Sequence, residues 1–111
     1  MEHLTPNERK AVLELKEALQ EMLGNRLAGL YLFGSKARGD YSSDSDIDIA
    51  VIVRGLTKEL KRAVFDKAAD IELENDVYLS TLVLSEEEFE LLKKRERRIA
   101  LDIEREGVPL L

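Results

Sequence analysis

The stretch GSKARGDYSSDSDID, residues 34–48, decides the fold. It follows residues 27–33, a nearly continuous apolar run that contains Gly29 and is typical of a strand covered on both faces. It leads into residues 46–53, where β-branched side chains dominate, which predicts a second strand. The polar stretch therefore connects two buried strands, and its side chains gather where the first strand ends and the second begins.

Two carboxylates stand at the end of this stretch. In a strand, residues two apart point to the same face, so Asp46 and Asp48 project together while Ile47 points away. Unpaired, the two carboxylates would repel each other, and a hard divalent cation such as Mg²⁺ removes that conflict. The alternative is a charged edge strand, on which acids discourage pairing with other sheets.

The beginning of the stretch favours a phosphate site. Gly34 allows close approach of the backbone, and a short helix beginning at Ser35 would aim its free amides outward. Lys36 and Arg38 add positive charge to the same loop. An ion pair with Asp40 or Asp44 that shapes the loop is the alternative for Arg38. A nucleoside triphosphate with its metal would use both halves of the stretch.

The rest of the chain predicts one further helix before this motif, and a helix, a strand and a final helix after it. Thr5, with Glu8 three residues later, is a typical start of a helix, and the pattern predicts that this helix covers residues 6–23. Further along, the pattern predicts a helix after Thr57 that ends within 70–75, a strand over 76–84, and one long final helix from Ser85 to Gly107. The fold class is α/β (α+β), a small mixed sheet with helices packed on one side, in the order α-β-β-α-β-α.

Composition limits the class of protein. A chain of 111 residues has the size of one domain, and the absence of cysteine excludes disulfides and thiolate metal sites. Its net charge of −6 disfavours direct nucleic-acid binding. No apolar run approaches the length of a membrane span, and the first residues do not resemble a signal peptide. We therefore expect a cytoplasmic protein.

Two other motifs with similar spacing fail. Asp44, Asp46 and Asp48 have the spacing of an EF-hand loop, but Ile49 occupies the position of its turn glycine. A P-loop would need Lys-Ser or Lys-Thr after Gly39, where Asp40 and Tyr41 stand instead.

The pattern Gly34-Ser35, ten residues, then Asp46-Ile47-Asp48 resembles the G-S-x10-D-x-D signature of the DNA polymerase β-like nucleotidyltransferases, and is most similar to their minimal (MNT) group. The resemblance implies a single minimal nucleotidyltransferase domain over residues 1–111. It also implies that Asp46 and Asp48 are catalytic and hold Mg²⁺, and that the outer phosphates lie at Gly34 and Ser35. A hydroxyl would then attack the α-phosphate, and pyrophosphate would leave.

The chain departs from this family at one position. The family usually carries a third acid on a later strand, and counting back from Ser85 places Ser80 there. A neutral hydroxyl is a weak metal ligand and no base at neutral pH. Asp76 is the nearest acid, and we interpret it as a strand-start or turn residue, because it would lie about 13 Å away along the strand.

The resemblance implies transfer of AMP from ATP or another nucleoside triphosphate to a hydroxyl. It suggests a tyrosine of a HEPN-type toxin as acceptor, which would make the chain an antitoxin. Because of Ser80, the alternative is a catalytically weak or inactive nucleotide-binding module that neutralises a partner by binding. A small-molecule nucleotidyltransferase is less favoured, since no second domain forms a substrate pocket. The sequence does not decide whether the chain forms a homo-oligomer. Residues 93–98 carry five positive charges, either as a solvated face or as a contact for an acidic partner or substrate.

Overall fold

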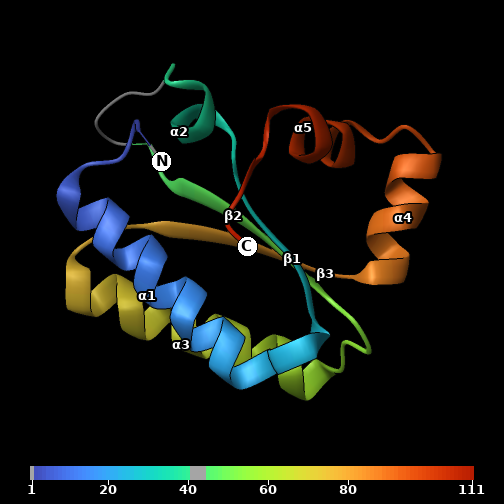
Figure 1. Ribbon diagram of the computed structural model, residues 1–111, viewed down its shortest axis with the longest axis horizontal. Coiled ribbons are helices and arrows are strands. Elements are labelled where there is room, and N and C mark those ends of the chain that lie inside the picture. The colour runs from blue at the N-terminus through green and yellow to red at the C-terminus, as the bar shows by residue number, and fades with distance from the viewer. Residues whose placement is uncertain (1, 41–44) are drawn as a thin grey trace.

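A computed structural model describes residues 2–40 and 45–111 of the chain (Figure 1). Within these residues, no helix is both long enough and apolar enough to cross a membrane. The elements in chain order are α1 (Pro6–Leu23), η1 (Gly24–Arg26), β1 (Leu27–Phe33), α2 (Ser35–Arg38), β2 (Ile47–Val53), α3 (Lys58–Asn75), β3 (Leu79–Ser85), α4 (Glu86–Lys94), α5 (Arg98–Glu106) and β4 (Val108–Pro109).

The strands form one mixed sheet in the order β3-β2-β1-β4. β1 is antiparallel to both β2 and β4, whereas β2 is parallel to β3. This register aligns Phe33 with Asp48 and Asp48 with Ser80. The predicted α/β class and the small mixed sheet are confirmed, and the short strand β4 is an addition that the sequence pattern did not predict.

Helices cover both faces of this sheet. The long helices α1 and α3 lie side by side on one face, where Leu15 and Leu19 pack with Ile49 of β2 in a buried cluster. On the other face, Ile52 of β2 packs with Phe89 of α4. The expectation that helices pack on one side is therefore incomplete. Strands that are apolar on both sides need cover on both sides, and α4 and α5 provide the second layer.

Side-chain caps start the helices where the sequence predicts. The Glu8 backbone N–H donates to the Thr5 hydroxyl at 3.1 Å, and the Thr5 N–H donates back to the Glu8 carboxylate at 3.0 Å. Ser85 and Glu88 form the same reciprocal pair at the start of α4. Each pair satisfies two amides that the first helical turn leaves free.

The predicted final helix is divided in two. Glu96 takes a φ of 54°, its N–H donates to the Lys93 carbonyl at 3.0 Å, and the Arg97 N–H donates to the Leu92 carbonyl at 2.9 Å. These two hydrogen bonds are the Schellman ending of a helix, which usually places glycine at the left-handed position. Glutamate stands there instead, so the sequence carried no stop signal, and the prediction of one continuous helix was wrong.

Candidate functional site

The sequence motif gathers at one end of the sheet. Gly34 follows the last residue of β1, Asp46 directly precedes β2, and Asp48 is the second residue of that strand. Ser80 is the second residue of β3 and is aligned with Asp48 in the parallel register. Figure 1 shows α2 at this end of the sheet, near α5. Three strand ends therefore carry the candidate site.

Gly34 and Asp48 are in direct contact. Gly34 has a φ of 72° and a ψ of −157°, a conformation that side chains rarely adopt. A Cβ built on Gly34 would overlap an oxygen of the Asp48 carboxylate and lie 3.1 Å from its Cγ. The Gly34 carbonyl accepts hydrogen bonds from the amides of Ala37 and Arg38, which starts α2. Only glycine therefore permits this approach of the loop backbone to the carboxylate.

The surroundings of Asp48 disfavour its charged form. Its side chain is partly buried, and burial raises the pKa of this carboxyl; the neighbouring charge of Asp46 raises it further. A hydrogen bond from the Ser80 hydroxyl and the charge of Arg38 act in the opposite direction. Asp46 itself is exposed. The site thus holds two carboxylates close enough to repel each other, without enough positive charge to compensate.

This donor set fits Mg²⁺. Mg²⁺ is commonly bound by one or two carboxylates together with substrate phosphates and water, rather than by an all-protein cage. Asp46 and Asp48 supply such a pair, and a bound cation would relieve the repulsion that raises the Asp48 pKa. Over residues 2–40 and 45–111, no group of three or more acidic, histidine or cysteine side chains forms a complete metal site. The remaining ligands would have to come from the nucleotide and solvent.

Lys36 is buried in an ion pair with another helix, whereas the sequence suggested that it contacts phosphate. Its side chain is 2% exposed, and its ammonium lies 3.0 Å from the Glu8 carboxylate of α1. Although burial opposes the effect, the Thr5 amide and Lys36 hold the pKa of Glu8 below its ordinary value. Lys36 therefore joins α2 to α1 and takes no part in the candidate nucleotide site. The pairing was not foreseen because the two side chains are 28 positions apart in sequence, with β1 between them.

Arg38 makes ion pairs on the protein surface. Its guanidinium contacts Asp40 at 3.1 Å and Glu106, at the end of α5, at 3.0 Å. These two hydrogen bonds, with that to Asp40 the stronger influence, raise the pKa of Arg38. The predicted pairing with Asp40 is confirmed, whereas Asp44 lies outside the described residues. The pairing with Glu106 was not predicted, because nothing local in the sequence brings α5 to this loop. Arg38 still influences the charge of Asp48.

Ser80, which the sequence placed at the third acidic position, lies beside Asp48. The parallel register places Ser80 next to Asp48, as counting along the sequence predicted. Asp76 does not compensate, because it ends α3 with a φ of 52° and precedes β3. Its interpretation as a turn residue is correct, whereas the prediction that the strand begins at Asp76 was wrong.

The model of the nucleotidyltransferase domain matches residues 12–107. The chain belongs to this family. The matched region includes α2, Asp46, Asp48 and Ser80.

Individual relatives agree with this assignment. Two candidate protein adenylyltransferases of Methanocaldococcus jannaschii are similar in sequence. One is 40% identical over 75% of this chain and 79% of its own length. The other is 32% identical over 65% of this chain and 74% of its own length. The fold also resembles two solved toxin–antitoxin structures. A mutant MntA–HpeT complex has a TM-score of 0.58 at 19% identity, covering 90% of this chain and 72% of the other. A toxin–antitoxin with AMP-PNP has a TM-score of 0.56 at 22% identity, covering 88% and 71%.

Proposed function

We propose that this nucleotidyltransferase is a Mg²⁺-dependent enzyme that transfers AMP from ATP to a hydroxyl group of a partner protein. The observation that carries the proposal is the contact between Gly34 and Asp48, beside Asp46 at the start of β2. It places a glycine loop against a pair of carboxylates. Such a pair suits a metal-bound triphosphate better than it suits the unliganded end of an internal strand.

Each part of the site has a distinct role in this proposal. Asp46 and Asp48 hold Mg²⁺, which neutralises the charge of the triphosphate when bound. Gly34 and Ser35 present the loop backbone to the outer phosphates. Arg38 adds positive charge near Asp48, although Asp40 and Glu106 share that charge. Phosphoryl transfer needs positioning and charge neutralisation more than a protein nucleophile, so these groups are sufficient for binding and orientation.

The acceptor in this proposal is the hydroxyl of a tyrosine on a HEPN-type toxin, and the chain acts as its antitoxin. The tyrosine oxygen forms a bond to the α-phosphorus, the bond to the β-phosphate oxygen breaks, pyrophosphate leaves and the hydroxyl proton passes to water. The relatives described as protein adenylyltransferases support a protein acceptor, and the fold is shared with toxin–antitoxin complexes. A single minimal domain leaves the second protein to supply the wall of the acceptor pocket.

Ser80 favours a second candidate. A serine in place of the third acid leaves the acceptor hydroxyl without a neighbouring base, which predicts slow transfer. A nucleotide-binding module that neutralises its partner by binding alone would tolerate this serine. The two candidates therefore differ in whether a covalent product forms.

One experiment separates them. The chain is incubated with Mg²⁺, ATP labelled on the α-phosphate, and the protein encoded beside it in the genome. Label on that protein, lost when its candidate tyrosine is changed to Phe, supports the transferase. A tight complex without label supports the binding module, and absence of both label and complex contradicts the proposed partnership.

A further inference from the structure

The outer face of α4 carries a charge pattern that the nucleotide site does not use. Glu87, Leu91 and Lys94 are spaced by four and three residues, so they lie in one stripe along the helix, opposite the buried Phe89. Leu91 is 46% exposed. The stripe therefore runs from an acidic end through an exposed apolar centre to a basic end. Ser80 lies near the start of β3 and α4 follows its end, so the stripe is remote from the candidate site.

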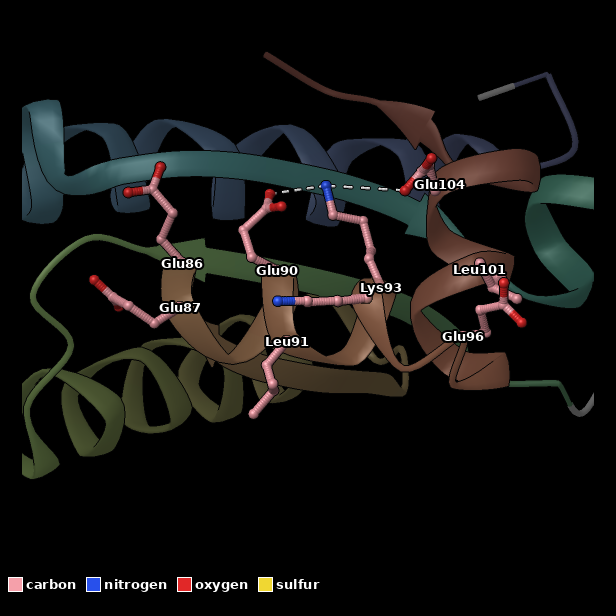
Figure 2. A pocket seen from close by; sticks show the side chains of 9 residues that line it. Glu86, Glu87, Glu90, Leu91, Lys93, Glu96, Leu101 and Glu104 are labelled. Atoms are coloured by element: carbon pink, nitrogen blue, oxygen red, sulfur yellow. Dashed lines mark ion pairs between the residues drawn. The ribbon is translucent and has the colours of Figure 1, made fainter.

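The stripe borders an open hollow of about 980 Å³ between α4 and α5, whose lining includes Glu90, Leu101 and Glu104. Figure 2 shows Lys93 reaching across between Glu90 and Glu104, with ion pairs of 2.8 and 3.8 Å. Lys93 also lies 4.7 Å above the centre of the Phe89 ring. These contacts tie α4 to α5 and fix one wall of the hollow.

The two charged ends of the stripe are available to another molecule. Both Glu87 and Lys94 are exposed, and within the described residues neither makes an ion pair. Figure 2 shows Glu87 and Leu91 projecting from α4 without contact with α5. An exposed leucine between two unused charges of opposite sign is a pattern that a matching helix can cover.

We propose that this face binds α4 of a second copy of the chain, antiparallel and across a two-fold axis near Leu91. Glu87 and Lys94 are seven residues apart, about 10 Å along the helix. Antiparallel packing about the centre of the stripe places Glu87 of each copy opposite Lys94 of the other and brings the two Leu91 side chains together. The pattern is self-complementary, as a closed two-fold interface requires. Parallel packing of the same two faces would instead place like charges opposite each other.

The expected dimer is weak and sensitive to salt. Exposed ion pairs contribute little individually and are screened by salt, so burial of Leu91 must supply much of the attraction. We expect a dissociation constant in roughly the micromolar range or above. The proposal does not depend on nucleotide transfer, because no residue of the stripe belongs to the candidate site.

Charge reversal tests the pairing by sedimentation equilibrium without nucleotide. The symmetry means that Glu87→Lys replaces two attractive pairs by two repulsive ones, and so does Lys94→Glu. Each variant alone should dissociate at least about tenfold more readily than the natural chain. An equimolar mixture of the two variants pairs one positive stripe with one negative stripe, which restores two attractive pairs, and should form a heterodimer. Leu91→Ala should also weaken dimerisation, and Asp70→Lys on the exposed side of α3 should leave it unchanged.

Circular dichroism of each variant controls for loss of helix, since Lys at the start of α4 and Glu at its end oppose the helix dipole. The natural chain remaining monomeric at its highest soluble concentration overturns the proposal. A dimer that persists in both reversal variants, or a mixture of the two that fails to associate, overturns it as well. Binding of a basic partner protein at this hollow by a monomeric chain would assign the surface to that partner instead.

Discussion

Replacing Gly34 with alanine tests the contact on which the candidate site depends. Alanine would adopt a φ of 72° at a cost of about 1–3 kcal/mol, since this backbone region is nearly restricted to glycine. The new Cβ must also displace the Asp48 carboxylate, and overpacking of this kind typically costs a further ~1–3 kcal/mol. Against a total stability of about 5–15 kcal/mol, the loss is large enough to measure by urea unfolding.

Gly24 provides a matched control. It also has a positive φ, of 55°, but a Cβ there would meet no atom within 4 Å. Gly24→Ala should therefore cost the backbone strain alone and leave ATP binding unchanged. Gly34→Ala should be less stable than Gly24→Ala and should lose ATP binding.

A double substitution isolates the contact itself. Asp48→Ala removes the carboxylate that the new Cβ meets, so adding it to Gly34→Ala should recover about 1 kcal/mol or more of the predicted loss. If Gly34→Ala is as stable as Gly24→Ala, or if Asp48→Ala changes nothing in its presence, the reasoning about the contact is refuted.

Three further perturbations follow from the same geometry. Lys36→Met should destabilise the fold by about 3 kcal/mol in urea unfolding, because it leaves the Glu8 carboxylate without its buried partner. Adding Glu8→Gln to Lys36→Met should recover most of this loss, and equal stability of the single and double variants would contradict the role of the ion pair. Ser80→Asp should increase the rate of label transfer about a hundredfold by adding a base beside Asp48, and an unchanged or lower rate would show that the serine does not limit activity. The raised pKa of Asp48 means that its ionised form opposes folding, so without metal Asp48→Asn should melt at a higher temperature than the natural chain at pH 7. That advantage should disappear as the pH falls below the ordinary carboxyl pKa of 3.8, where Asp48 is protonated in both states, and an advantage of the same size at low pH would contradict the assignment.

Much of the fold could be predicted because local sequence determines it. The bounds of β1 agree with the apolar run 27–33, and the caps at Thr5 and Ser85 start their helices as predicted. Periodicity and capping act over a few residues, so they can be read directly. The helix ending at Glu96 could not be predicted in this way, because a residue that seldom adopts positive φ takes the place of glycine there.

The candidate site was only partly predictable. The spacing of Gly34, Asp46 and Asp48 carries the family signature, and counting placed Ser80 beside Asp48 correctly. The charge of Lys36 indicated a phosphate contact, but its environment depends on the Glu8 carboxylate at the start of α1, which the fold brings to α2. Long-range packing decides whether a lysine faces solvent or a buried carboxylate, and residue type alone does not contain that information.

The most direct test of the account is the affinity for ATP, measured by calorimetry with and without Mg²⁺. The natural chain should bind ATP more tightly when Mg²⁺ is present, because Asp46 and Asp48 hold the cation against the phosphates. The variant with Asp46→Asn and Asp48→Asn should lose this gain while keeping its fold. Equal affinities in all four measurements would contradict the claim that the two carboxylates grip a metal-bound triphosphate.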